Sequence, residues 1–183
     1  MVVLLILTST QHLSAKVYMS KEEFLELLSA KDATLVGSDF ATKTLWLNKN
    51  TQDDIKKILN HKYPKLRLRY KTNQNAISNT DPSATLNPTT VWFLDEIGKE
   101  RPITFAVAVK NHKIQAIRVL EFRESRGYEI KLPAFVKQFE QIGVDQKGKL
   151  DHNIDGITGA TMSVRAMKNI SRLALLLHKK TLI

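Results

Sequence analysis

The fold depends most on the stretch TTVWFLDEIGKERPITFAVAVKNHKIQAIRVLEF, residues 89–122. It contains three runs of apolar, β-branched and aromatic residues, which favour strands because such side chains pack well on a pleated surface. The runs are Val91–Leu94, Ile103–Val109 and Ile114–Phe122. Between the last two lies a two-residue turn, Asn111-His112, which predicts an antiparallel hairpin. We therefore expect a meander of antiparallel strands.

Two capping patterns upstream of the meander predict short helices. Ser20 and Glu23 have the spacing of a capping box, and apolar residues then recur at helical intervals, so we expect a helix over residues 21–29. Thr51 and Asp54 precede a second set of apolar residues at helical spacing and predict another short helix.

Two further strands are predicted in the same region, at residues 44–47 and 65–71. In the second, apolar residues alternate with lysine and arginine, which is the period of a half-buried strand with a cationic outer face. That face is either simply solvated or a docking strip for an acidic redox partner. Residues 71–88 are rich in Asn, Ser, Thr and Pro and predict a long loop.

Two helices are predicted after the meander. Pro133 opens a short amphipathic helix. A longer amphipathic helix is expected at residues 162–180, where His178, Lys179 and Lys180 place cations at the negative end of the helix dipole. The predicted fold class is therefore α+β, an antiparallel sheet or meander with short helices and a C-terminal amphipathic helix.

The composition limits the chemistry that the chain can perform. Its net charge of +10 favours acidic partners, anionic lipid or nucleic acid without choosing among them. It has no cysteine, which excludes disulfides, cysteine-ligated iron–sulfur clusters and thioether-linked haem. The histidines lack the paired spacing of a metal site, so we expect no zinc or iron centre. Redox chemistry would need a cofactor that is held in another way.

The first residues, MVVLLILTSTQHLSA, have the order of a secretory signal: a short apolar run, a polar stretch and small residues before Lys16. No basic residue precedes the apolar run, so we expect the true start codon to lie upstream. The alternative is a buried first strand at residues 2–7. The expected organisation is a signal segment at 1–15, an N-terminal α/β extension or cap at 16–88, and the remainder of the same domain at 89–183.

Directly before the last predicted helix lies the stretch DGITGAT, residues 155–161. Its two glycines permit a tight backbone that a ligand can approach closely. The free N–H groups and the positive dipole end of the following helix favour a negatively charged group at Thr161, and a phosphate suits such a position. Each residue alone is also ordinary, because Thr161 suits a helix N-cap and Asp155 or Thr158 suits a turn.

This stretch resembles the D-G-x-[S/T]-G-A-T motif of the FMN-binding domain family, which is found in components of sodium-pumping NADH:quinone reductase and of Rnf complexes. In that family the final threonine carries the flavin. The resemblance therefore implies an FMN-binding domain at residues 89–183, with FMN bound covalently to Thr161 through a phosphodiester. It also implies a separate flavin transferase that uses FAD and a divalent metal. The residues that this transferase would recognise are Asp155, Gly156, Thr158, Gly159 and Ala160.

The resemblance extends to the stretch ESRGYEI, residues 124–130. It looks like the family's Glu- and Gly-containing loop, although Ser125 and Tyr128 depart from the usual E-T-x-G-L-G. The resemblance implies flavin contacts from Glu124, Gly127 and Tyr128.

Other side chains are candidates on chemical grounds. An aromatic ring could stack on the flavin, and a guanidinium could stabilise its anionic reduced form. The aromatic candidates are Tyr128, Trp92 and Phe122, and the arginines are Arg126 and Arg123.

These features predict an electron-transfer flavoprotein at the periplasmic or extracytoplasmic face of the membrane, which relays electrons and is not a stand-alone enzyme. The expected partners are the flavin transferase and a redox partner such as a cytochrome or a membrane reductase. One alternative is a noncovalent flavin reductase, although the sequence has no G-x-G-x-x-G loop for a nicotinamide cofactor. Another is a basic nucleic-acid-binding module, but no such motif is recognised, and we expect no nucleic-acid partner. A third, a fold kept only for complex assembly, is disfavoured by the intact motif.

Overall fold

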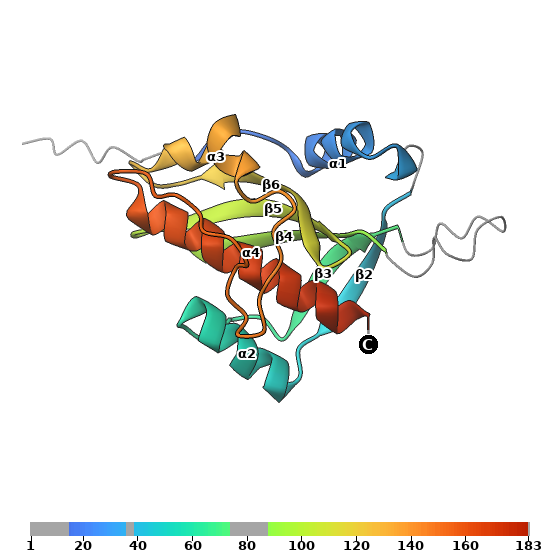
Figure 1. Ribbon diagram of the computed structural model, residues 1–183. Coiled ribbons are helices and arrows are strands. Elements are labelled where there is room, and N and C mark those ends of the chain that lie inside the picture. Colours follow the sequence, from blue (N-terminus) through green and yellow to red (C-terminus); the bar gives the residue numbers. More distant parts are fainter. Residues whose placement is uncertain (1–14, 36–38, 74–87, 183) are drawn as a thin grey trace, which may run out of the picture.

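The computed structural model describes residues 15–35, 39–73 and 88–182 (Figure 1). These residues form a six-stranded sheet in the order β1-β6-β5-β4-β3-β2, in which each neighbouring pair is antiparallel. The strands are β1 (Lys16–Val17), β2 (Ala41–Trp46), β3 (Arg67–Thr72), β4 (Thr90–Ile97), β5 (Pro102–Lys110) and β6 (Lys113–Phe122). The helices are α1 (Lys21–Lys31), α2 (Lys49–Leu59), α3 (Pro133–Lys137) and α4 (Thr161–Thr181), with 3-10 turns η1 (Ala33–Leu35) and η3 (Tyr128–Lys131). The predicted α+β class is confirmed.

Some predictions lie outside the described residues. They are the signal segment up to Ser14, the alternative first strand at residues 2–7, and residues 74–87 of the predicted loop.

The predicted meander is formed by β4, β5 and β6. Asn111 and His112 connect β5 to β6 with φ angles of 53° and 58°. Two consecutive residues with positive φ are typical of the tight turn that matches the right-handed twist of a hairpin. Trp92 pairs with Val107, and Val107 pairs with Ile117. Because paired residues of neighbouring strands point to the same face of a sheet, these three side chains lie on one face.

Two apolar cores lie on opposite faces of this sheet. On one face α4 crosses the strands with α2 beside it (Figure 1), and their apolar side chains pack around Trp92 and Phe105. On the other face Phe24 and Leu28 of α1 pack against small side chains such as Ala106. Because α4 covers several strands, it provides a rigid support on which a site can be placed.

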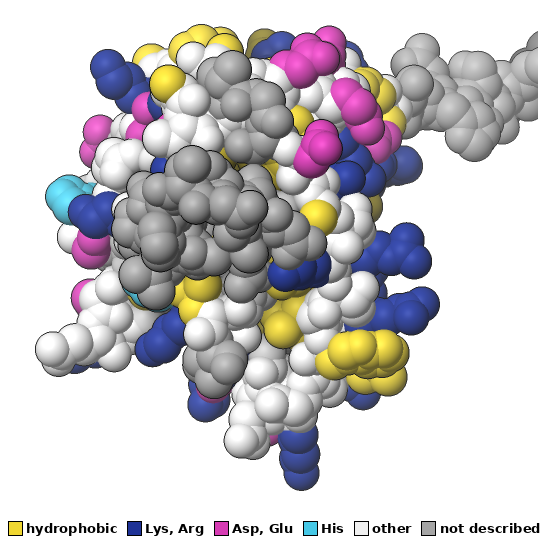
Figure 2. All heavy atoms as spheres, turned by 90° about the vertical axis from the view of Figure 1, so that its right-hand side faces the viewer, with side chains coloured by type: hydrophobic (Ala, Val, Ile, Leu, Met, Phe, Trp, Pro, Cys, Tyr) yellow, Lys and Arg dark blue, Asp and Glu magenta, His cyan; other side chains and the backbone are white. Residues whose placement is uncertain are grey.

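The cationic row predicted at residues 65–71 is present in β3. Arg67 and Arg69 are exposed, whereas Leu68 and Tyr70 are buried in the core that contains α4. Since side chains alternate along a strand, the two arginines lie on the face opposite α4. Figure 2 shows Lys and Arg side chains projecting from this far side, at the right of the view. The sheet thus separates the row from Thr161, and this favours a solvated face over a docking strip for a redox partner.

The capping patterns predicted the start of α1 correctly but placed the start of α2 too late. Ser20 and Glu23 form the predicted capping box, with both reciprocal hydrogen bonds present. The second helix was predicted to start near Thr51, but its N-cap is Asn48, whose side chain accepts a hydrogen bond from the Thr51 amide at 2.9 Å. An Asn side chain at this position satisfies an amide that would otherwise be free, so α2 begins earlier than expected.

At the C-terminal end of α4, one of the three predicted cations is neutral. His178 was expected to be a cation near the helix terminus, but its side chain is buried. Burial, with His112 nearby, lowers the pKa of His178 to about 4, so the imidazole is neutral at pH 7. Lys179 and Lys180 remain to complement the helix dipole. Within residues 15–35, 39–73 and 88–182, no helix has the length and apolar character needed to cross a bilayer.

Candidate functional site

The helix α4 begins at the exposed Thr161 and lacks a side-chain cap. Thr161 is the first helical residue, and Ala160 occupies the N-cap position that the sequence suggested for Thr161. Alanine has no oxygen to accept the first amides, and the first amide of the helix to find an intrahelical partner is that of Val164, which donates to Ala160 O at 2.9 Å. Within the described residues, the Thr161 hydroxyl has no hydrogen-bond partner. Free amides and a free hydroxyl therefore lie together at the positive end of the helix dipole.

The loop before α4 leaves open space beside its two glycines. Gly159 has a φ of +82°, a conformation that disfavours other residues, and the amide of Ala160 closes a turn onto Ile157 O at 3.0 Å. Gly156 has no such backbone requirement. A Cβ added at either glycine would meet no atom within 4 Å. Because packing does not require glycine at position 156, the open space there suits the close approach of a ligand or another protein.

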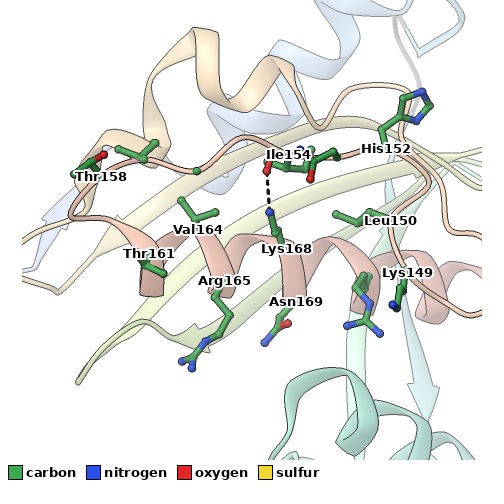
Figure 3. Close-up of a pocket in the computed structure, with 14 residues that line it drawn as sticks. Lys149, Leu150, His152, Ile154, Thr158, Thr161, Val164, Arg165, Lys168 and Asn169 are labelled. Carbon is green, nitrogen blue, oxygen red and sulfur yellow. Dashed lines mark hydrogen bonds between the residues drawn. The ribbon is translucent and has the colours of Figure 1, made fainter.

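Polar contacts hold this loop against the rest of the domain. The amide of Asp155 donates to Gln138 Oε1 at 2.9 Å, and Lys168 Nζ donates to Ile154 O at 2.9 Å (Figure 3). The side chain of Ile154 is buried in the main core. The loop is thus fixed on both sides of its backbone, although the side chains of Asp155 and Thr158 are exposed.

A cavity of about 840 Å³ lies between this loop and α4 (Figure 3). Its volume is in the range of small-molecule sites. Thr161, Gly156 and Thr158 line it, together with apolar surface from Val164 and Ile154. The candidate attachment residue therefore opens directly into a cavity, as a covalently bound ligand would require.

Four cations line the same cavity. They are Lys149, Arg165, Lys168 and Arg172. Three of them donate to backbone carbonyls: Arg165 to Gly98 O at 3.2 Å, Lys168 to Ile154 O, and Arg172 to Gly148 O at 2.8 Å. Among the residues that the structure describes, none of the four forms a salt bridge to a carboxylate. The cavity is therefore cationic and complements a negatively charged ligand.

Residues 98–176 match the family model described as FMN-binding domain. This segment is an FMN-binding domain. The match takes in β5, β6, α3, the loop at 155–160 and most of α4, and it confirms the family that the sequence motif suggested. No curated protein and no solved structure gave a significant match.

The residues of the site fit FMN chemically. Its phosphate suits the uncapped amides of α4 and the nearby cations, and its ring system requires a cavity with some apolar surface such as that of Val164. The open space at Gly156 admits a bulky group close to the backbone. No group of three or more His, Asp or Glu side chains in the described parts of the chain is placed to hold a metal ion.

The FMN-binding domain brings its second motif into contact with the first. Gly127 has a φ of +86°, and a Cβ built there would lie 2.4 Å from Ser163 Oγ and 3.5 Å from Ala160 Cα. The loop at 124–130 therefore packs directly on the first turn of α4, and only glycine fits at 127. Ala160 is 2% exposed and belongs to the core, so its side chain packs inward.

Glu124, for which the sequence predicted a flavin contact, binds the backbone of a nearby turn and is not among the residues that line the cavity. Its Oε1 accepts hydrogen bonds from the amides of Lys99, Glu100 and Arg101 at 2.6, 2.6 and 2.9 Å. Partial burial acts to raise the pKa of Glu124, but the three amides outweigh it and hold the pKa below its usual value. The carboxylate thus fixes the turn between β4 and β5, and Arg165 binds the same turn at Gly98 O. Through this turn, Glu124 supports the position of Arg165, which lines the cavity.

Two of the three aromatic candidates are excluded as stacking partners. Trp92 is fully buried, stacks on Tyr70 with ring centroids 4.7 Å apart, and donates to Thr90 Oγ1. Phe122 is also buried in the core. Tyr128 is 46% exposed and lies beside Lys131, but it is not among the residues that line the cavity.

The arginines that line the cavity are not those named from the sequence. Arg123 forms an ion pair with Glu121 and donates to Thr104 Oγ1 at 3.0 Å, so its guanidinium is engaged on the sheet. Arg126 is exposed and does not line the cavity. Sequence reasoning missed Arg165 and its neighbours on α4. Their spacing from Thr161 at helical intervals was the signal that could have found them.

Residues outside the matched segment also reach the wall of the cavity. Asn169, which lines it, donates to the buried Glu96 of β4 at 3.3 Å, and Glu96 Oε2 lies 3.0 Å from His61 Nε2. Burial lowers the pKa of His61, but the hydrogen bond to Glu96 outweighs this and the pKa is raised. His61, which follows α2, is therefore linked to α4 through Glu96 and Asn169.

Proposed function

We propose that the FMN-binding domain carries FMN in a phosphodiester bond to Thr161, and that the loaded protein transfers electrons outside the cytoplasm. The observation that carries this proposal is the position of Thr161. Its exposed side chain lies at an uncapped helix N-terminus and lines a cationic cavity, which Gly156, with open space beside it, also lines. These are the features that a phosphate linkage needs.

Attachment is proposed to depend on a separate flavin transferase. The Thr161 oxygen would attack the FMN phosphorus of FAD, the pyrophosphate bond would break, AMP would leave, and the hydroxyl proton would pass to a base of that enzyme. Because Thr161 and most of the loop before it are exposed, a second protein can reach them. This chain supplies the acceptor hydroxyl and the surrounding loop geometry.

Bound flavin supplies one- and two-electron chemistry, while the protein holds it and sets its electrostatic surroundings. The proposed partners are the transferase and a redox protein such as a cytochrome or membrane reductase. A net charge of +10 favours an acidic redox partner. The extracytoplasmic location is proposed from the signal-like order of residues 1–15.

The test is the intact mass of the denatured protein after co-expression with a flavin transferase. We expect an added mass of one FMN less one water in the parent, and none in Thr161→Val, which removes the hydroxyl at an exposed position. Thr181→Val, at the other end of α4, is the matched control and should keep the adduct. A flavinylated Thr161→Val protein would refute the attachment site, and a folded parent that binds FMN only reversibly would favour the noncovalent alternative.

A further inference from the structure

We infer that a cationic stripe on α4, formed by Arg165, Lys168 and Arg172, stabilises negative charge on the bound flavin and so raises its reduction potential. This inference rests on the proposed attachment of FMN to Thr161. It assigns the electrostatic role to residues of this chain that lie outside the DGITGAT motif and the loop at 124–130.

The geometry of the helix places the stripe next to the attachment residue. Residues at i, i+4, i+7 and i+11 lie along one side of an α-helix, and this is the spacing of Thr161, Arg165, Lys168 and Arg172. At 1.5 Å per residue the stripe extends about 16 Å from Thr161. All four residues line the same cavity. A group tethered at Thr161 and held in this cavity therefore lies alongside the stripe.

The cations of the stripe have unused hydrogen-bonding capacity. Each donates to a backbone carbonyl: Arg165 to Gly98 O, Lys168 to Ile154 O and Arg172 to Gly148 O. An ammonium has three N–H donors and a guanidinium has five, so donors remain on every member. In the described ranges no carboxylate is paired with the stripe, so its charge is available to a ligand.

Burial makes this charge effective. Lys168 and Arg172 are half-buried, so water screens them less than it screens fully exposed cations. A positive charge close to a flavin favours the reduced form that carries negative charge, and raises the potential at which the flavin accepts electrons. Because Arg123 and Arg126 do not line the cavity, the stripe is better placed for this role than either of them.

The test compares Lys168→Met and Arg172→Met with Lys179→Met, which removes an exposed cation of the same helix outside the cavity. Intact mass first establishes that each protein carries FMN. We then expect a lower reduction potential and a higher ionisation pKa of the reduced flavin in the two stripe variants than in the parent, with a larger shift in the double variant. Lys168→Arg and Arg172→Lys, which keep the charge, should restore values close to the parent.

The outcomes separate this inference from the proposed function. Flavinylated stripe variants with the parent's potential would overturn the inference and leave the attachment site intact. If the parent carries no adduct, the proposed attachment fails, and free FMN is titrated into the parent, Lys168→Met and Lys179→Met proteins instead. About tenfold weaker binding in Lys168→Met, but not in Lys179→Met, would then support the cationic stripe as a flavin-binding wall, and equal binding would overturn it.

Discussion

The two ends of α4 differ in solvent exposure and in packing. At its start Thr161 is exposed, the N-cap is an alanine, and open space lies beside Gly156 and Gly159. Near its end His178 is 1% exposed, and its Nδ1 lies 2.8 Å from the hydroxyl of Thr90 in the core. The helix α4 is therefore held in the core at its C-terminal end and exposes a hydroxyl group at its N-terminal end.

This contrast indicates which contacts stabilise the site. An uncapped helix start forgoes about 1 kcal/mol of capping stabilisation, because its amides are left to water or a ligand. The buried end of α4 and the packing of Gly127 on Ser163 hold the first turn in place. Changes at the buried contacts should thus lower stability, whereas changes at the open loop should lower flavin attachment.

The largest loss of stability at neutral pH is expected from Gly127→Ala. The new Cβ would lie 2.4 Å from Ser163 Oγ and would force a residue with a side chain into a φ of +86°. We expect a loss of at least about 2 kcal/mol, measured by urea denaturation. Gly148→Ala is the matched control, because its φ is +70° but a Cβ there meets no atom within 4 Å, and it should cost only about 1 kcal/mol. Equal losses would contradict close packing of the loop at 124–130 on α4.

The buried His178 should make the free energy of unfolding depend on pH in the acidic range. The pKa of His178 is about 4 in the folded protein, below its unfolded value, so the unfolded state binds more protons between these two values. Stability from this group is complete above the unfolded pKa and is lost as the pH falls toward 4, by up to roughly 3 kcal/mol. His61 has a raised pKa and acts in the opposite direction, losing its contribution as the pH rises.

The measurement is the free energy of unfolding at several pH values, in the parent and in His178→Gln. Subtracting the two curves removes the carboxylates and His61, which both proteins share. A difference that does not change between pH 7 and pH 4.5 would contradict a buried, neutral His178.

The smallest stability effects are expected in the open loop. Gly156→Ala should change the free energy of unfolding by less than about 0.5 kcal/mol, because its Cβ meets open space at an ordinary φ. Gly159→Ala should cost about 1 kcal/mol, because its φ is +82°. Both should reduce the fraction of protein that carries FMN, measured by intact mass after a limited time of co-expression. Full and equally fast flavinylation of Gly156→Ala would mean that the space beside it has no role.

Much of the fold could be predicted because its signals are local. The strands of the meander, the Asn111-His112 turn and the helices at α1 and α4 follow from periodicity and capping within short windows. β1 could not, since it has two residues and is defined by its pairing with Phe122 and Glu121 of β6. The burial of His178 likewise depends on Thr90, which is far away in the sequence.

The part of the site that lies within one contiguous motif could be predicted from the sequence. DGITGAT located the helix start and the exposed hydroxyl of Thr161, but tertiary contacts decide the rest. Glu124 is engaged by amides that precede it by more than twenty residues, and Trp92 is enclosed by the core. Arg165, Lys168 and Arg172 line a cavity that the loop at 149–158 forms with α4, so their place in the site depends on tertiary structure.

The most direct measurement is tandem mass spectrometry of the tryptic peptide spanning residues 150–165, taken from protein co-expressed with a flavin transferase. Cleavage after Lys149 and Arg165 isolates the peptide LDHNIDGITGATMSVR, which contains three hydroxyl residues: Thr158, Thr161 and Ser163. We expect fragment ions that place FMN less one water on Thr161. An FMN on Thr158 or Ser163, or an unmodified peptide from folded, exported protein, would contradict the attachment of FMN to Thr161.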